Sequence, residues 1–390
     1  MRKHIAVTVI LVLIISVILA GFFWWRNQLG EERKASEPNR QETEAQEQTE
    51  VVNQAEDQTE GTRGTQHGIS EGTETEEENA SDITMIFTGD VLFANSFSAS
   101  YDSGGIENVV SEDVREELNQ ADITMVNEEF PFSTRGTPME DKQYTFRADP
   151  AYVTALLEMG VDIVTLANNH ILDYGKDALT DTFTTLDHAG IKYAGAGASA
   201  ERAKELQTIE VQGRKIGFLA ASRVIPVSDW NVDNSVPGVF TTYDGTALCN
   251  AVEEAEQLCD YVVVFVHWGV ENEAYPQDYQ ESLAKQYIDA GADLVIGCHT
   301  HCLQGVEYYN GKPIYYSLGN FIFGSEIVRS MAVKVTLHPD SSVECRLVPV
   351  YAAAGRTEKM SEEDAASLYQ YLESISDGIA ISKDGVVQEK

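Results

Sequence analysis

The stretch YVVVFVHWG, from Tyr261 to Gly269, shows the pattern that decides the fold: an unbroken apolar run that ends in a histidine. A short apolar run bounded by a glycine predicts a buried strand. The same succession of apolar and then polar residues recurs along the chain. These runs cover Ile83–Thr88, Asp122–Val126, Asp162–Ala167 and Asp293–Ile296, and Lys215–Ala220 is a further candidate strand.

Amphipathic stretches lie between the apolar runs and predict helices. They cover Val109–Asn119, Ala151–Met159, Asp177–His188, Thr246–Leu258 and Gln277–Ala290. This alternation predicts an α/β fold with a largely parallel central sheet. After Gly297 the pattern changes to hairpins, because an Asn-Gly pair between apolar runs is a strong turn signal. The later elements are Gly305–Tyr309 and Ile314–Leu318 around Asn310-Gly311, a second pair at Met331–Leu337 and Val343–Val350, and a helix at Ser361–Ile375.

Polar residues follow the apolar runs directly, and in an open parallel sheet such strand ends share one edge, where ligands bind. We therefore expect one site built from Asp90, Glu129, Asn169, His170, His267, His299 and His301. Imidazole, carboxylate and amide oxygen together suit zinc, manganese or iron. A set of this size fits two ions, or one ion with catalytic groups, and a two-metal site lowers the pKa of a bridging water.

Each piece of this set also has a purely structural interpretation. Gly89-Asp90 alone is typical of a turn or helix cap, and His267 beside Trp268 is compatible with a packed histidine. The joint placement at equivalent strand ends favours the site. Cys298 and Cys302 bracket the histidine pair; we interpret them as small thiols flanking the site, with a local disulfide as the alternative.

The amino-acid composition limits the kinds of partner that the protein can bind. The 390 residues contain Lys+Arg 27 and Asp+Glu 63, for a formal net charge of −36. Such acidity argues against nucleic acid as a partner, because phosphate binding needs a basic surface. The 43% hydrophobic content is enough for a folded core.

The N-terminal part reads as a membrane anchor followed by a tether. Residues 5–25 carry no charge and are long enough, at about 20 residues, to cross a bilayer. Residues 1–29 are therefore predicted to be a cytoplasmic stub and an uncleaved signal anchor that contacts the lipid bilayer, with a cleaved signal peptide as the alternative. Arg2 and Lys3 favour a single-pass protein of the cell membrane whose bulk is extracellular. Residues 30–81 have the composition of a disordered acidic linker, or else of an acidic partner-binding tail.

Several motifs, in this order, resemble the CapA family, which is named for poly-γ-glutamate capsule biosynthesis. They are Phe87-Thr88-Gly89-Asp90, Asn127-x-Glu129, Ala167-Asn168-Asn169-His170, His267-Trp268-Gly269, Gly297-x-His299-x-His301 and Leu318-Gly319-Asn320-Phe321. The similarity covers roughly Ile83 to Pro349. The family is similar to calcineurin-type metallophosphoesterases, so the resemblance implies a four-layered α/β/β/α sandwich. We assign it to residues 82–355, with a C-terminal helix and tail at residues 356–390.

The resemblance also implies roles. Asp90 matches a ligand of a first metal and a catalytic position, Glu129 the residue that bridges two metals, and His301 a further first-metal ligand. Asn169, His267 and His299 match second-metal ligands, and His170 the general acid. This chain departs from the Asp-x-His motif of the phosphoesterases because Leu92 stands in place of the histidine. This difference from the motif weakens the first metal site, so the site is expected to hold either one ion or two.

Four more residues are candidates for binding the substrate. Arg135 and Arg147 follow the second motif, and an arginine there would clamp a carboxylate or phosphate. Asn127 and Asn168 precede the expected ligands. Two functions remain open. One is a metal-dependent hydrolase or transferase acting on a phosphoester or an anionic polymer. The other is a non-catalytic polymer-binding or export subunit that contacts a membrane synthase.

Overall fold

The computed structural model describes residues 81–233, 235–324 and 327–390. The predicted anchor and almost all of the predicted linker lie outside these residues. Within the described ranges, no helix has the length and apolar character needed to span a membrane.

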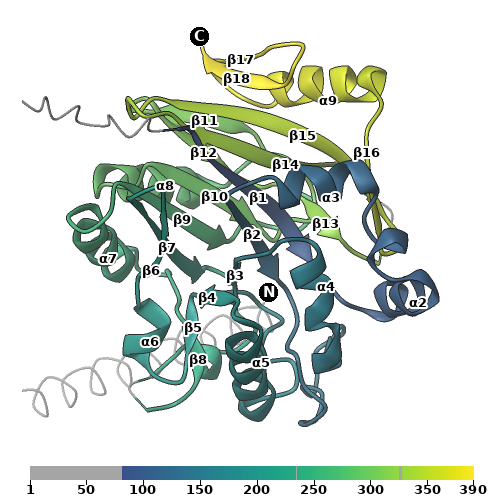
Figure 1. Cartoon of the computed structure of the whole chain (residues 1–390). Coiled ribbons are helices and arrows are strands. Elements are labelled where there is room, and N and C mark those ends of the chain that lie inside the picture. Colours follow the sequence, from purple (N-terminus) through teal and green to yellow (C-terminus); the bar gives the residue numbers. More distant parts are fainter. Residues whose placement is uncertain (1–80, 234, 325–326) are drawn as a thin grey trace, which may run out of the picture. The chain divides into compact units, whose positions relative to one another are not determined.

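Two sheets form the centre of the described part (Figure 1). The larger has ten strands in the order β17-β18-β15-β14-β1-β2-β3-β4, with β13 paired to β1 and β16 to β15. Its strands are β1 (Ile83–Val91), β2 (Ile123–Glu128), β3 (Ile163–Thr165), β4 (Lys192–Ala194), β13 (Asn320–Ile322), β14 (Ile327–Leu337), β15 (Val343–Ala353), β16 (Arg356–Lys359), β17 (Ile379–Ile381) and β18 (Val386–Glu389).

The smaller sheet has six strands in the order β11-β12-β10-β9-β7-β6. They are β6 (Gln207–Val211), β7 (Arg214–Ser222), β9 (Tyr261–His267), β10 (Leu294–Cys298), β11 (Val306–Tyr309) and β12 (Lys312–Tyr315). A separate short pair joins β5 (Ala196–Gly197) and β8 (Gly238–Val239). The alternation of strands and helices is confirmed. The strands form two sheets rather than the one central sheet expected from that alternation, and two sheets agree with the sandwich that the resemblance implies. Strands buried on both faces read as continuous apolar runs, so the sequence does not show which strands share a sheet.

Helices cover the sheets. They are α2 (Asn95–Gly104), α3 (Glu112–Asn119), α4 (Val153–Glu158), α5 (Lys176–Ala189), α6 (Ala200–Lys204), α7 (Thr246–Glu256), α8 (Asp278–Asp289) and α9 (Glu362–Ser374). Figure 1 shows α7 and α8 on the outer side of the six-stranded sheet, and α3 and α4 beside the ten-stranded sheet.

Strand β9 shows why the two sheets pack face to face. Val262, Val264 and Val266 belong to the core that includes α7 and α8. Val263 and Phe265 point the other way, into the core shared with the ten-stranded sheet. Side chains alternate between the faces of a strand, so β9 needs apolar residues at every position.

The later part of the chain agrees with most expectations. β11 and β12 form the predicted hairpin, and β14 pairs antiparallel with β15. α9 begins after Ser361, whose side chain accepts the backbone N–H of Asp364 as an N-cap. The C-terminal residues are more than a tail, because β16 and β18 both pair with β15 and so extend the large sheet.

Candidate metal centre

The parallel strands of both sheets end at one place, and their polar side chains meet there. Asp90, near the end of β1, receives the backbone N–H of His299, 3.3 Å away, from the loop after β10. Asn127, in β2, lies with its Nδ2 3.4 Å from Nδ1 of His267, the last residue of β9. The structure thus brings together the residues that the sequence analysis expected to converge, although they come from two sheets.

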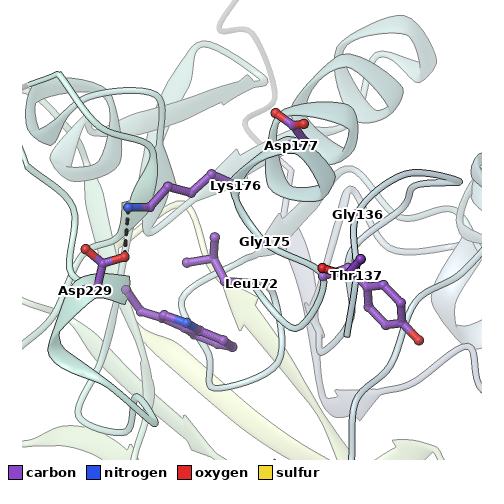
Figure 2. Close-up of a pocket in the computed structure, with 9 residues that line it drawn as sticks. Gly136, Thr137, Leu172, Gly175, Lys176, Asp177 and Asp229 are labelled. Carbon is purple, nitrogen blue, oxygen red and sulfur yellow. Dashed lines mark hydrogen bonds and ion pairs between the residues drawn. The ribbon is translucent and has the colours of Figure 1, made fainter. Parts of the chain in front are cut away.

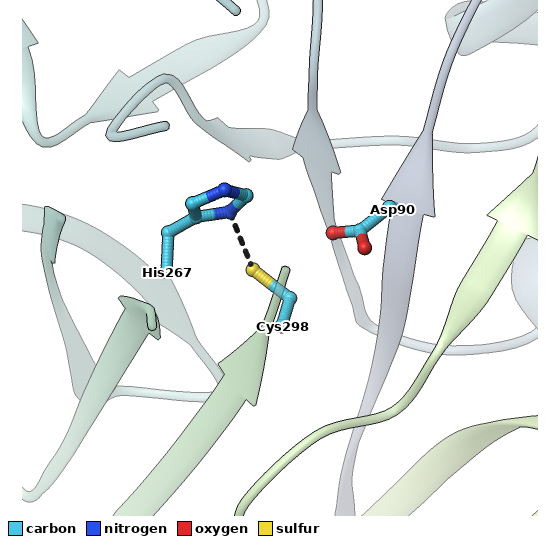
Figure 3. A group of neighbouring side chains, drawn as sticks. All are labelled: Asp90, His267 and Cys298. Carbon is cyan, nitrogen blue, oxygen red and sulfur yellow. Dashed lines mark hydrogen bonds between the residues drawn. The ribbon is translucent and has the colours of Figure 1, made fainter. Parts of the chain in front are cut away.

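Three overlapping groups of side chains lie close enough to share an ion. Within each group, one donor atom per residue lies within 4.8 Å of the others. The groups are Asp90–Glu129–His301, Glu129–His267–His299, and Asp90–His267–Cys298. Figure 3 shows the third group, with Asp90 on one strand facing His267 and Cys298 on neighbouring strands. Glu129 is common to the first two groups, which is the arrangement expected of a bridging ligand.

Asn169 completes the second group. Its Oδ1 lies 2.8 Å from Nε2 of His267, and its side chain is only partly buried. His301 is also partly exposed, whereas Glu129 is fully buried. The centre is therefore open to solvent on the side of Asn169 and His301.

Unpaired buried atoms support a cation at this place. Both carboxylate oxygens of Glu129 and Nδ1 of His299 are buried without a hydrogen-bond partner among the described residues. A buried polar atom without a partner costs about 1–3 kcal/mol. Carboxylate, imidazole and amide donors that converge on one point fit a divalent metal.

The electrostatics show what the metal-free cluster lacks. Burial, with the nearby Asp90, raises the pKa of Glu129 well above its ordinary value. Burial, with the nearby His301, lowers the pKa of His299 to about 3. Burial also opposes charge on His301, but its contacts with Asp90 and Glu129 outweigh this and raise its pKa to about 10. In the metal-free cluster, His301 and the nearby Lys142 supply positive charge beside the acids, where a metal ion would supply more.

The backbone of the histidine loop is strained. His299 has φ 99° and His301 has φ 57°, both in a region that non-glycine residues rarely adopt. Such conformations cost about 1–3 kcal/mol each and concentrate at functional sites.

His170 sits beside the cluster in a hydrogen-bonded group of its own. Its Nδ1 lies 2.7 Å from the fully buried Asp173 carboxylate. The Nζ of Lys142 lies 3.0 Å from the same Nδ1, donates to the backbone carbonyl of Asn169 at 2.5 Å, and pairs with Asp173. Burial lowers the pKa of His170, and the charge of Lys142 adds to this, while Asp173 opposes it.

The side chains of the two asparagines expected to bind substrate form hydrogen bonds within the protein. Asn168 accepts the backbone N–H groups of His170 and Ile171 and donates to Asn127 and to the carbonyl of Glu128. These four bonds leave its amide no free group, which argues against the substrate role. Asn127 in turn donates to Asp90 at 2.7 Å, so this pair orients an expected ligand.

The two arginines lie outside the cluster. Arg135 pairs with Asp181 and Asp177 on α5 and is about half exposed. Arg147 donates to the carbonyl of Arg135 and stacks over Tyr174, 4.2 Å from the ring centroid. Their role in substrate binding stays a prediction.

A pocket of about 440 Å³ opens next to the centre (Figure 2). Leu172 and Gly175 line it and come from the loop that carries His170. Trp230, on another side, lies under Nζ of Lys142 at 5.1 Å from the ring centroid. Lys176 and Asp229 form an ion pair of 2.9 Å at this pocket.

The sequence analysis missed three contributors. Lys142 lies in a loop without periodic pattern, and only its positive charge gave a signal. Cys298 was predicted to flank the site as a small thiol but was given no role in it. Asn320 belongs to a motif noticed in the sequence but given no role; its Oδ1 lies 2.8 Å from Nδ1 of His301, and it pairs with Asp90 where β13 meets β1.

Comparisons with known proteins agree with the motif order. Residues 84–325 match the family "Bacterial capsule synthesis protein PGA_cap". The capsule biosynthesis protein CapA of Bacillus anthracis is 29% identical over 74% of this chain and 72% of its own length. The PGA biosynthesis protein CapA of Bacillus subtilis is 30% identical over 62% of this chain and 63% of its own length. Among solved structures, the NAD nucleotidase of Haemophilus influenzae aligns over 78% of this chain and 65% of that chain, with 11% identity and a TM-score of 0.44. That likeness is too distant to carry an argument.

Proposed function

Because the chain belongs to the PGA_cap family of bacterial capsule synthesis proteins, we propose that it acts on an anionic envelope polymer such as poly-γ-glutamate through a metal-dependent hydrolase or transferase site. One observation carries the metal-dependent part. Glu129 is fully buried, lacks a hydrogen-bond partner among the described residues, and belongs to two of the three groups of ligand atoms.

The metal would be manganese, zinc or iron, as one or two ions. Glu129, Asn169, His267 and His299 would hold one ion, and Asp90, Glu129 and His301 the other. A divalent metal at this place would supply a Lewis acid for a substrate oxygen and lower the pKa of a water. The second group has more donors, so it is the better candidate for a single ion.

His170 would accept and donate a proton during the reaction. Its Nδ1–H donates to Asp173, which leaves Nε2 as the free ring nitrogen. Since burial keeps its pKa low, the resting imidazole is neutral and accepts a proton before it can donate one. The general-acid role implied by the resemblance therefore requires an earlier proton transfer to Nε2.

Lys142 would bind the anionic part of the substrate. Its Nζ reaches the edge of the centre, where it contacts His170 and the carbonyl of Asn169. Its side chain is 14% exposed, so it keeps access to solvent on this side. We expect Lys142→Met to weaken binding of a polycarboxylate more than Arg135→Met does, because Lys142 contacts His170 beside the centre, whereas Arg135 pairs with Asp181 outside the cluster.

We further propose that residues 5–25 anchor the protein in the cell membrane and that the residues after them face outward. The proposal rests on the uncharged apolar run and on the cations that precede it. A membrane synthase or export subunit would then be the natural partner.

The second candidate function is a non-catalytic polymer-binding or export subunit. Leu92 favours it, because this buried leucine stands where the phosphoesterase motif has a metal-binding histidine. In that case the remaining ligands would serve binding alone.

The test compares the metal-supplemented full chain with His299→Ala and with His188→Ala. His188 is exposed on α5, so its variant is the matched control for loss of a histidine. Shortening of poly-γ-glutamate or hydrolysis of a phosphodiester by wild type and His188→Ala, with loss in His299→Ala, supports the catalytic function. Polymer binding without turnover in all three proteins overturns it in favour of the second candidate.

A further inference from the structure

Cys298 lies opposite His267 in the six-stranded sheet. It is the last residue of β10 and the register partner of His267 at the end of the parallel strand β9. Side chains at paired positions of neighbouring strands leave the sheet on the same face. Both are buried, and Sγ of Cys298 is 3.2 Å from Nδ1 of His267 (Figure 3).

The two ring nitrogens of His267 face different surroundings. Nε2 lies 2.8 Å from Oδ1 of Asn169 and 3.7 Å from Oε1 of Glu129. Nδ1 faces Cys298 and, at 3.4 Å, Nδ2 of Asn127. The position of the ring proton therefore decides which side of the imidazole can bind a metal.

Neighbouring groups decide which nitrogen carries that proton. In the metal-free chain Oδ1 of Asn169 can only accept, so it takes Nε2–H of His267 at 2.8 Å. A metal at Nε2 requires the ring proton to be on Nδ1 instead.

Asn127 accepts from Asn168 through Oδ1 and donates one N–H of Nδ2 to Asp90 at 2.7 Å, so the Nδ2 that faces His267 is a donor and offers Nδ1–H no acceptor. Its 3.4 Å contact with His267 is longer than an ordinary N–H hydrogen bond. The thiol of Cys298 has the backbone carbonyl of Val266 as an acceptor at 3.8 Å, which frees a sulfur lone pair. The sulfur is thus available to accept Nδ1–H.

The unpaired atoms lie on the other side of the ring. Glu129, grouped with His267 and His299, has no hydrogen-bond partner on either oxygen, and neither has Nδ1 of His299. Asp90, on the Cys298 side, already receives Asn127 and the backbone of His299. A cation is therefore needed on the Nε2 side.

We propose that Cys298 is a positioning residue of the metal centre: its sulfur accepts Nδ1–H of His267 and so presents Nε2 to the metal beside Glu129 and His299. The inference rests on the proposed metal centre. Metal-binding histidines commonly give their other N–H to an acceptor, and loss of that acceptor lowers metal affinity about 10–100-fold. A thiol in this role is a property of this chain's own loop.

The opposing arrangement makes Cys298 a ligand. Asp90, His267 and Cys298 also lie within the distance limit of one ion. Nδ1 would then bind the metal, and His267 would be withdrawn from Glu129 and His299. The two arrangements exclude each other, because Nδ1 cannot carry both a proton and a metal.

The experiment measures zinc and cobalt(II) affinity of the full chain and of Cys298→Ala, Cys298→Ser and Cys302→Ala. Cys302 lies on the loop that follows β10, and its thiol contacts the Thr300 hydroxyl, so it is the matched control. We expect about 10–100-fold weaker binding in Cys298→Ala, near wild-type binding in Cys298→Ser because serine is also an acceptor, and no change in Cys302→Ala. Equal affinity of Cys298→Ala and wild type would overturn the proposal. If Cys298→Ala does not fold, Cys298→Val takes its place.

Two spectra complete the test. The cobalt(II) form of wild type should lack a thiolate-to-cobalt charge-transfer band; such a band, lost in Cys298→Ser, would show direct ligation and contradict the proposal. Proton–nitrogen NMR of the zinc-bound chain should show His267 protonated at Nδ1, and a zinc-bound ring without Nδ1–H would also contradict it. A wild-type chain that binds no metal would instead overturn the proposed centre, whereas zinc binding without Nδ1–H would overturn the role of Cys298 alone.

Discussion

Replacing Glu129 by glutamine should change stability in opposite directions with and without metal. In the metal-free chain this carboxyl group is fully buried, and burial with the nearby Asp90 raises its pKa well above the ordinary 4.5. The unfolded chain ionises there at its ordinary pKa, so wild type loses stability as the pH rises from 4.5 toward the raised pKa. Glutamine is neutral at every pH and avoids this loss.

The magnitude follows from the linkage relation. Each pH unit between the two pKa values corresponds to about 1.4 kcal/mol of unfolding free energy. At pH 5.5, one unit above the ordinary value, Glu129→Gln should gain about 1.4 kcal/mol over wild type relative to their difference at low pH. With metal at 100 times its Kd, wild type gains about 2.7 kcal/mol, and the variant, which lacks the shared carboxylate, gains less. Rising pH therefore shifts the stability difference toward the variant, and metal shifts it back toward wild type.

The assay is urea unfolding of both proteins from pH 4 to pH 7, with a chelator and then with manganese, zinc or iron. Glu116→Gln, at an exposed position on α3, is the control for loss of one carboxylate. A metal-free Glu129→Gln that is no more stable relative to wild type at pH 5.5 than at pH 4 would refute the reasoning, because Glu129 would then have an adequate partner. Equal stabilisation of both proteins by metal would show that Glu129 is not a ligand.

Three further changes test other parts of the structure by urea unfolding. Asp173→Asn should lower the free energy of unfolding by about 3–5 kcal/mol, because it leaves Lys142 buried without its ion partner; a loss below 1 kcal/mol would contradict this. Gly297→Ala should lower it by more than the roughly 1–3 kcal/mol typical of overpacking, because its Cβ would lie 2.0 Å from the carbonyl oxygen of Tyr316; wild-type stability would show that the strands are further apart. Burial raises the pKa of Glu117, but Arg346 and two lysines outweigh it and lower the pKa overall. Its contribution is present above pH 4.5 and lost as the pH falls through the lowered pKa, so the advantage of wild type over Glu117→Gln should shrink in acid, and an advantage that grows would contradict the sign.

The sequence predicts the strands of the site well because their apolar runs are continuous. β9 was expected at Tyr261–Val266 and runs from Tyr261 to His267. Its neighbour β10 was expected at Asp293–Ile296 and runs from Leu294 to Cys298. The polar residue after each run then fixes a position at the strand end, which is why the histidines could be placed together.

Helix α2 shows what the pattern does not reveal. It covers Asn95–Gly104, a stretch rich in serine and aspartate that has weak helix propensity, and Phe97 is its buried residue. Stacking of Phe97 on Phe93, with ring centroids 3.7 Å apart, holds it in place. A contact of this kind depends on the folded structure and leaves no periodic signal.

The sequence pattern also does not predict the site residues whose partners are distant in the chain. Lys142 reaches His170 from a segment without regular structure, and its partners are 27 to 31 residues away in the chain. The role proposed for Cys298 depends on its pairing with His267 across strands β10 and β9, and only the sheet register shows this pairing. Conversely, the motif containing Asn168 suggested substrate contact, and the structure uses that amide to hold the loop.

Metal content and thermal unfolding of the full chain test the central claim most directly. Wild type and His299→Ala would be stripped with chelator, supplied with manganese, zinc and iron in turn, and assayed for bound metal and for the midpoint of unfolding. Wild type should bind one or two ions per chain and gain about 2.7–4.1 kcal/mol at 100 to 1,000 times Kd, while His299→Ala gains much less. No bound metal in wild type, or equal stabilisation of both proteins, would contradict the account.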